Sequence, residues 1–127
     1  ERLKYEWHQE SQFYPSHKYG LHLWFPLFRS INPKNDGGMK FAKGSNIKNY
    51  PYKESFKKNG WRQRVPKINV EKKFKVVNIG LRRGDVVLFE NKLLHKSDEQ
   101  LNDLPRVAFV IRFISNGTNN AYKIIQN

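Results

Sequence analysis

Two short stretches far apart in the chain carry side chains that can bind a metal ion. In Trp7-His8-Gln9-Glu10 the histidine and the carboxylate are two residues apart, so on a β-strand both would point to the same side. Alone, this pair is more typical of exposed polar residues at the end of a strand. A later apolar run ends at His95, which would complete a set of two imidazoles and one carboxylate if strands bring it alongside. That set is the facial triad of non-haem Fe(II) oxygenases.

Short apolar runs separated by turn residues dominate the sequence, and they predict strands rather than helices. Turn chemistry such as Asn59-Gly60 lies between the runs. Residues 50–58 fit either a short helix after Pro51 or a long loop. Eight or nine strands in one domain predict a β-sandwich or jelly roll. The strands are expected at residues 3–7, 19–28, 38–42, 65–70, 74–79, 85–89, 93–96, 107–113 and 121–125.

Composition restricts the class of protein and the kind of metal site. A chain of 127 residues with 38% hydrophobic residues is large enough for one core. No apolar run is long enough to span a bilayer, so we expect a soluble, cytoplasmic protein with no membrane partner. The chain has no cysteine, which excludes disulfides and thiolate metal sites and leaves histidine and carboxylate as ligands.

The net charge of +13 is unevenly distributed. Half of the 24 Lys and Arg residues lie in residues 40–75, where Glu54 and Glu71 are the only acids. Such a segment is compatible with a solvated surface or with a site for an anionic substrate or a phosphate-bearing partner. Nucleic acid is not an expected partner, because no helix-turn-helix, zinc-finger or RNP-type signature is present.

The order of several motifs resembles the phytanoyl-CoA dioxygenase family of Fe(II)/2-oxoglutarate-dependent oxygenases. Trp7-His8-Gln9-Glu10 is similar to that family's Trp-His-Gln-Asp metal motif, and Arg106 follows His95 by eleven residues, as in the family. Further similar stretches are Leu23-Trp24-Phe25-Pro26-Leu27, Asn35-Asp36-Gly37-Gly38-Met39, Lys43-Gly44-Ser45-Asn46, Gly84-Asp85-Val86-Val87-Leu88-Phe89 and His95-Lys96-Ser97. The resemblance implies a mainly all-β double-stranded β-helix, which is a cupin-like jelly roll.

The resemblance also implies roles for individual residues. His8, Glu10 and His95 would bind Fe(II). Arg106 would hold the far carboxylate of 2-oxoglutarate, because a fork-shaped guanidinium matches a carboxylate. The remaining implied cosubstrate contacts are Ser97, Gln9 and Trp24. From the residues alone, a surface arginine and a turn hydroxyl stay open alternatives for Arg106 and Ser97.

Strand alternation adds two candidates that line the active site. His22 shares a strand face with Trp24, so it would either line the site or serve as a hydrogen-bonded structural histidine. Arg112 shares a strand face with Arg106, and we expect this side of the strand to line the mouth of the barrel. The opposite face of that strand is expected to pack in the core between the sheets; it carries Val107, Phe109, Ile111 and Phe113.

Two features differ from the family pattern. Glu10 stands where Asp is commoner, and its extra methylene shifts the ligand oxygen. A carboxylate at this position argues against halogenation, because related halogenases have a small residue there. The chain is also short for the family, which predicts that residues 1–127 are a single catalytic core lacking its N-terminal part. Such a core would expose an apolar sheet face, and we expect it to form a homodimer.

The expected function is an Fe(II)/2-oxoglutarate-dependent dioxygenase that hydroxylates a small molecule and converts 2-oxoglutarate to succinate and CO2. The alternative is a metal-free or inactive cupin-like module that binds an anionic ligand. We expect residues 11–18 and 46–64 to build the substrate pocket. The basic segment 40–75 favours a substrate with an anionic group such as phosphate, sulfate or a carrier thioester.

Overall fold

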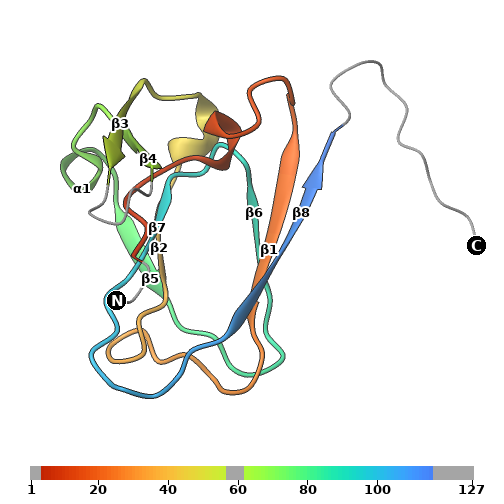
Figure 1. Ribbon diagram of the computed structural model, residues 1–127, viewed down its shortest axis with the longest axis vertical. Helices are drawn as coiled ribbons and strands as arrows, with labels where there is room; N and C mark the ends of the chain where they lie inside the picture. Colours follow the sequence, from red (N-terminus) through yellow and green to blue (C-terminus); the bar gives the residue numbers. More distant parts are fainter. Residues whose placement is uncertain (1–3, 57–61, 116–127) are drawn as a thin grey trace, which may run out of the picture.

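Two three-stranded antiparallel sheets face each other in the computed structural model, which describes residues 4–56 and 62–115 (Figure 1). One sheet has the order β6-β1-β8, formed by Val87–Glu90, Gly20–Pro26 and Ala108–Ile114. The other has the order β5-β2-β7, formed by Val76–Ile79, Met39–Ala42 and His95–Ser97. Strands that pair are distant in sequence, as in a jelly roll. The expected all-β, cupin-like fold is confirmed.

Smaller elements gather at one end of the two sheets, at the top of Figure 1. Strands β3 (Tyr52–Phe56) and β4 (Arg62–Pro66) form an antiparallel pair. The short helix α1 (Val70–Lys73) begins at Asn69, whose Oδ1 accepts a hydrogen bond from the Lys72 amide at 3.1 Å. Two single 3-10 turns complete the set, η1 (Glu10–Gln12) and η2 (Ser45–Ile47).

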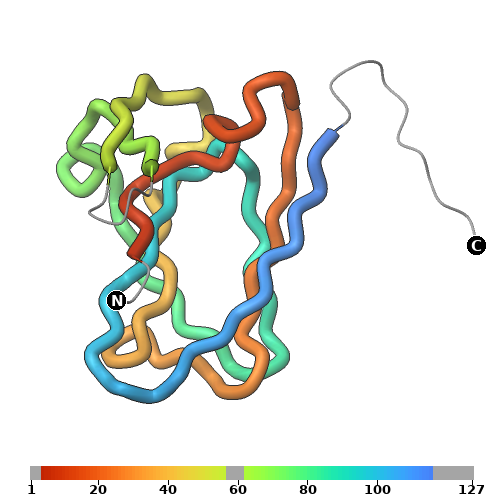
Figure 2. Tube along the Cα trace, in the orientation of Figure 1, coloured from red at the N-terminus to blue at the C-terminus, as the bar shows by residue number. Residues whose placement is uncertain are grey.

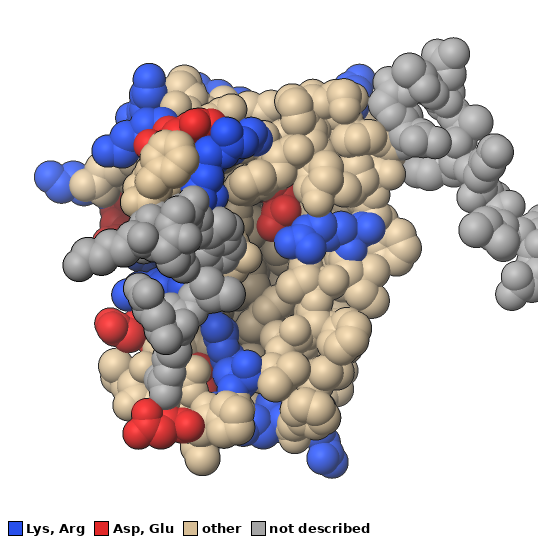
Figure 3. All heavy atoms as spheres, viewed as in Figure 1, with Lys and Arg blue, Asp and Glu red and all other residues tan. Residues whose placement is uncertain are grey.

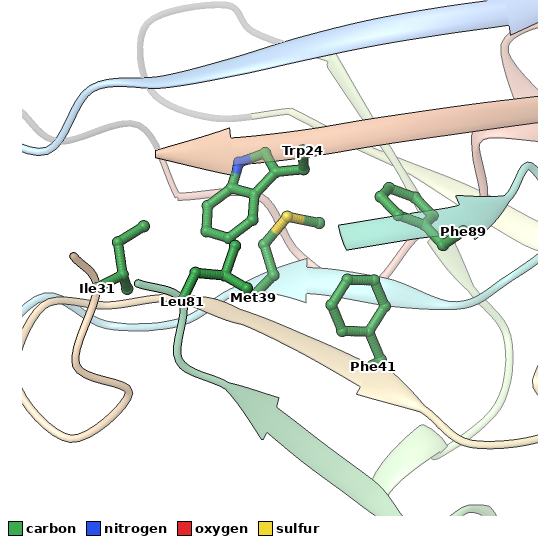
Figure 4. Packing of buried hydrophobic residues seen from close by; sticks show 6 residues of the cluster. All are labelled: Trp24, Ile31, Met39, Phe41, Leu81 and Phe89. Carbon is green, nitrogen blue, oxygen red and sulfur yellow. The ribbon is translucent and has the colours of Figure 1, made fainter. Parts of the chain in front are cut away.

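The main core fills the space between the sheets. Figure 4 shows Trp24 and Phe89 from one sheet pointing toward Met39 and Phe41 from the other. Burying side chains of this size stabilises the fold by roughly 1.5–3 kcal/mol each. Alternation along β1 explains the arrangement, since Trp24 points inward and Leu21 outward. A second buried cluster lies around Trp7, Ala42, Tyr50, Val70 and Leu94.

The outer face of the β6-β1-β8 sheet is apolar and exposed. The outward side chains of β8 and of Val107 before it, which we expected in the core, are 40–58% exposed: Val107, Phe109, Ile111 and Phe113. That expectation is wrong, because the inward side of this sheet is the side with Trp24 and Phe89. Leu21 and Leu88 extend the apolar face onto β1 and β6. The exposed apolar sheet face is as expected, while the homodimer stays a prediction.

Most strand predictions are confirmed within a few residues, and two are not. In residues 50–58, expected to form a short helix or a loop, the described part forms strand β3 (Tyr52–Phe56). Residues 65–70 are divided between the end of β4 and the start of α1. No strand forms over residues 4–7, although the next residue, His8, makes an isolated bridge to His95. The predicted strand at 121–125 and Leu3 lie outside the described residues. No helix in the described part of the chain is long and apolar enough to cross a membrane.

Candidate metal centre

Three buried side chains converge where the N-terminal segment meets β7. The Nε2 atoms of His8 and His95 each lie 3.7 Å from Oε1 of Glu10. One ligand atom from each residue lies within 4.8 Å of the others. Ligands at right angles on a metal with bonds of about 2.1 Å are about 3.0 Å apart, so the three side chains would move closer together around a bound ion. The structure therefore brings together His8, Glu10 and His95.

Backbone carbonyls fix the orientation of both imidazoles. Nδ1 of His8 lies 2.7 Å from the Glu6 carbonyl oxygen, and Nδ1 of His95 lies 2.8 Å from that of Leu93. In each neutral ring Nδ1 must then carry the proton and donate it, which leaves the lone pair of Nε2 directed at Glu10. This arrangement around a histidine ligand is the usual one in metalloproteins.

The charges at the centre favour a cation between the three ligands. Burial lowers the pKa of His95 to about 4, with His8 adding to the shift, so the ring is neutral at neutral pH. Burial alone would raise the pKa of the Glu10 carboxyl, but His8, His95 and Arg112 outweigh it and hold this pKa well below its ordinary value. An ionised carboxylate thus faces two imidazole nitrogens. Electron-rich groups this close repel each other unless a proton or a metal ion lies between them.

Nearby backbone contacts explain why the ligands lie where they do. His8 and His95 exchange two backbone hydrogen bonds, from His8 N to His95 O at 3.0 Å and from His95 N to His8 O at 3.1 Å. Glu10 begins η1 rather than continuing a strand, so the expected i, i+2 strand geometry is not what brings it to His8. The Ser11 amide ties this turn to another segment by donating a hydrogen bond to the Asn91 carbonyl at 2.9 Å.

The side chain of Gln9, which we expected to contact the cosubstrate, instead links two backbone segments through hydrogen bonds. Its side chain is fully buried, and Nε2 donates to the carbonyls of Lys48 at 2.8 Å and Lys92 at 2.5 Å. Its Oε1 accepts the Tyr50 amide at 2.8 Å. The amide group is thus fully engaged with the backbone and does not line the cavity described below.

Arg106 and Ser97 lie toward the far end of β2 and β7 from the metal ligands. Arg106 donates from Nη1 to the carbonyls of Gly37 at 2.6 Å and Gly38 at 3.3 Å. Ser97 is paired in register with Met39, the residue after Gly38. Burial, and secondarily the nearby Arg29, lower the pKa of Arg106. Among the described residues no carboxylate lies within ion-pair distance of Arg106, so a half-buried cation is left without a counter-charge.

His22 and Trp24 both point into the space between the sheets. Trp24 is part of the main core cluster. His22 is completely buried and stacks on Phe89, with ring centroids 5.5 Å apart. Neither ring nitrogen of His22 has a hydrogen-bond partner among the described residues. The alternative of a hydrogen-bonded structural histidine is therefore not what the structure shows. A buried polar group without a partner is rare and points to a missing one.

A cavity of about 280 Å³ opens directly beside the metal ligands. Arg112, which we expected at the mouth of the barrel, lines this cavity from β8 and donates from Nε to Oε2 of Glu10 at 3.2 Å. The lining includes residues from both segments expected to build the substrate pocket. It consists of Tyr5, Glu6, His8, Glu10, Phe13, Tyr14, Arg62, Gln63, Arg64 and Arg112. Sequence reasoning did not single out Arg62 and Arg64, because both lie in the basic segment 40–75 and no strand was predicted over them.

Several solved structures have a similar fold. EvdO2 from Micromonospora carbonacea var. aurantiaca, also solved in complex with 2-oxoglutarate, superposes with a TM-score of 0.72 at 19% identity, over 89% of this chain and 46% of EvdO2. ThoJ, a non-heme monooxygenase solved in its apo form, gives 0.67 at 18% identity, over 89% of this chain and 40% of ThoJ. EvdMO1 gives 0.61 at 20% identity, over 89% of this chain and 23% of EvdMO1. At these identities the likeness shows the fold alone.

The chain spans less than half the length of each of these structures. Among curated proteins no sequence match was found. A family model does match: the one for phytanoyl-CoA dioxygenase (PhyH) covers residues 2–108, which include all three metal-ligand candidates and Arg106. Together with the β-fold and the His-Glu-His cluster, this match establishes that the chain belongs to the phytanoyl-CoA dioxygenase family.

Proposed function

We propose that this protein is an Fe(II)/2-oxoglutarate-dependent dioxygenase that hydroxylates a small molecule. The proposal is carried by the convergence of the two histidine Nε2 atoms and the Glu10 Oε1 atom. The other nitrogen of each imidazole is hydrogen-bonded to a backbone carbonyl, and Oε2 of Glu10 is hydrogen-bonded to Arg112. His8, Glu10 and His95 would hold the iron, leaving further positions open for other ligands. When bound, the iron supplies oxygen activation coupled to the conversion of 2-oxoglutarate to succinate and CO2.

The placement of Arg106 supports a site for the cosubstrate. The guanidinium is half-buried beside carbonyls and another cation, so an anion would relieve its lack of a counter-charge. Ser97 lies two residues beyond His95 on the same strand face, about 6.6 Å away along the backbone. That separation suits a five-carbon dicarboxylate with one end at the metal and the other at Arg106 and Ser97.

His22 adds a second unsatisfied group in the same interior. It lies on β1 opposite Arg112 in register, and the charges of Glu10 and Arg112 both act on it. We assign it the role of a hydrogen-bond donor to bound 2-oxoglutarate. Trp24, Phe41 and Phe89 surround this interior with apolar surface, which excludes water and strengthens each polar contact made there.

A second candidate function is a metal-free module that binds an anion. The ion pair between Arg112 and Glu10 favours it, because that pair gives the carboxylate a partner without any metal. In this case the cavity would keep its shape with the ligand triad empty, and 2-oxoglutarate would have no role.

Anaerobic absorption spectroscopy tests the proposal. Fe(II) and 2-oxoglutarate are added to the parent protein, to His95→Ala and to the matched control His17→Ala, which lies outside the ligand cluster. We expect a visible metal-to-ligand charge-transfer band in the parent and in His17→Ala, and no band in His95→Ala.

Calorimetric titration of 2-oxoglutarate into the iron-loaded protein isolates Arg106. Loss of the partner of a half-buried carboxylate typically costs 2–5 kcal/mol, so Arg106→Ala should bind 2-oxoglutarate at least about 30-fold more weakly. Unchanged affinity would reject the assignment of Arg106. A parent protein that binds neither metal nor 2-oxoglutarate would favour the metal-free module.

A further inference from the structure

The cavity beside the metal ligands is lined by three arginines from two separate elements. Arg62 and Arg64 belong to β4 of the two-stranded β3–β4 sheet and share one strand face, while Arg112 comes from β8 of the β6-β1-β8 sheet, drawn in blue in Figure 2. Figure 3 shows Lys and Arg side chains gathered over the β3–β4 corner, with further ones across from them on the β8 side of the same face. Three of these cations line the cavity that opens beside the metal ligands.

Arg64 is held in place by rings rather than by a carboxylate. Its guanidinium lies 5.1 Å from the ring centroid of Phe13 and 5.3 Å from that of Tyr52. It also donates from Nη1 to the Gln12 carbonyl. In the described part of the chain no acid lies within ion-pair distance of Arg64, and its buried Nε has no hydrogen-bond partner. Stacking of this kind orients a cation without neutralising it.

The other charges of the cavity do not cancel that of Arg64. Arg62 pairs with Glu54 at 3.3 Å, but about half of the Arg62 side chain is exposed, so solvent weakens this pair. Arg112 is paired with Glu10, whose charge would also be shared with a bound metal ion. Glu6 is the other acid in the lining. The described residues of the lining thus carry three cations against two carboxylates, and a divalent metal would make the cavity more positive.

We propose that this cavity binds an anionic oxygen-bearing group of the substrate, a phosphate, sulfate or carboxylate, with Arg64 as its principal contact. A guanidinium matches such groups through paired N–H donors. Tyr5, Phe13 and Tyr14 supply aromatic walls for the rest of the substrate. The volume of about 280 Å³ lies just below the ~300 Å³ of the smallest typical ligand pockets, which favours a small molecule. This assignment names the substrate class of the proposed oxygenase and so rests on the proposed function.

Calorimetry with phenyl phosphate tests the assignment, and phenol serves as the uncharged probe of similar shape. Both are titrated into the protein loaded with Fe(II) and 2-oxoglutarate under anaerobic conditions. We expect phenyl phosphate to bind and phenol to bind at least tenfold more weakly. Charged hydrogen bonds are worth about 1.5–3 kcal/mol, so Arg64→Gln should weaken phenyl phosphate about 10- to 100-fold.

Three further variants make the test specific. Arg64→Lys, which keeps the charge, should recover part of the affinity. Arg62→Gln should cost about two- to fivefold, because its side chain is exposed. Arg83→Gln, an exposed arginine outside the cavity, should change the affinity less than twofold. Circular dichroism and thermal unfolding establish that each variant is folded.

The outcomes separate this inference from the proposed function. Phenyl phosphate affinity that is the same in Arg64→Gln and the parent overturns the anion site, even if the charge-transfer band forms. Equal binding of phenol and phenyl phosphate overturns it as well. If the parent gives no charge-transfer band but binds phenyl phosphate in an Arg64-dependent way, the anion site stands and the oxygenase proposal fails.

Discussion

Arg112 and Glu10 are joined by two charged hydrogen bonds, from Nε to Oε2 at 3.2 Å and from Nη2 to Oε1 at 3.4 Å. The oxygen closer to Arg112, Oε2, is not the one that lies 3.7 Å from both histidine Nε2 atoms. Oε1 thus faces the metal position and also accepts the longer bond, from Nη2, while Oε2 accepts the shorter bond, from Nε. This contact orients the side chain of Glu10, which is one methylene longer than the aspartate that is commoner at this position.

Removing that contact should weaken metal binding. Loss of a group that orients a metal ligand typically costs 10- to 100-fold in affinity, so we expect Arg112→Leu to bind Fe(II) that much more weakly than the parent in anaerobic calorimetry. Arg82→Leu, an exposed arginine distant from the cluster, serves as the control. Tighter binding by Arg112→Leu would show instead that Arg112 competes with the metal for Glu10.

Gln9 should contribute to stability in the absence of any metal or cosubstrate. Gln9→Leu leaves two backbone carbonyls and one amide in the interior without their partner. Each such loss costs about 1–3 kcal/mol, and we expect the free energy of unfolding of the metal-free protein to fall by about 3 kcal/mol in urea denaturation. A residue that only contacted 2-oxoglutarate would leave this quantity unchanged.

Asp36 should make the protein sensitive to acid. The Asn32 amide at 2.7 Å, the Arg29 guanidinium at 2.7 Å and the Asn102 side chain lower the pKa of Asp36 to about 2. The folded protein therefore keeps this carboxylate ionised where the unfolded chain takes up a proton. Its stabilising effect is present above the unfolded pKa of 3.8 and is lost as the pH falls from there toward 2.

Urea denaturation between pH 2 and pH 7 measures this effect. We expect Asp36→Asn to cost about 1–2 kcal/mol at pH 7 and progressively less below pH 4. Asp85→Asn is the matched control, since Asp85 accepts a single backbone amide, that of Arg82. Parallel pH profiles for the parent and Asp36→Asn would contradict the prediction.

The exposed sheet face should tolerate charge that the core would not. Ile111→Lys places its ammonium in solvent, and we expect it to change the free energy of unfolding by less than about 1 kcal/mol. Leu94 is completely buried, so Leu94→Ala should cost about 2–5 kcal/mol. A large loss of stability in Ile111→Lys would show that this face is covered in solution, and size-exclusion chromatography would then test for the predicted homodimer.

The core strands were predictable because short apolar runs bounded by turn residues indicate strands, as at β1 and β8. The metal cluster was predictable because the order of the motifs around His8 and His95 resembles that of the phytanoyl-CoA dioxygenase family. The pairing of β3 with β4 was missed because most residues of both strands are polar, which gives no alternation of apolar and polar residues. The inward side of β8 was misjudged because both faces of that strand carry apolar residues.

The backbone contacts of Gln9 and the position of Arg64 in the cavity could not be predicted from the sequence, for a different reason. Gln9 donates hydrogen bonds to carbonyls 39 and 83 residues away. Because every residue has a backbone carbonyl, the type of a residue gives no signal for such contacts. Arg64 was one cation within a basic segment, and only the fold distinguishes it from its solvated neighbours by placing it against Phe13 and Tyr52.

The bridge between His8 and His95 joins the first described segment to a strand near the end of the fold. An ion bound to both residues would close a long loop of chain, and the entropy of such a closure changes only slowly with loop length. Because an unfolded chain holds no preformed triad, the free energy of ion binding would act directly on the folding equilibrium. A bound metal ion would then also hold the N-terminal segment against the rest of the fold. We expect removal of the ion to cause local unfolding of residues 4–12 first.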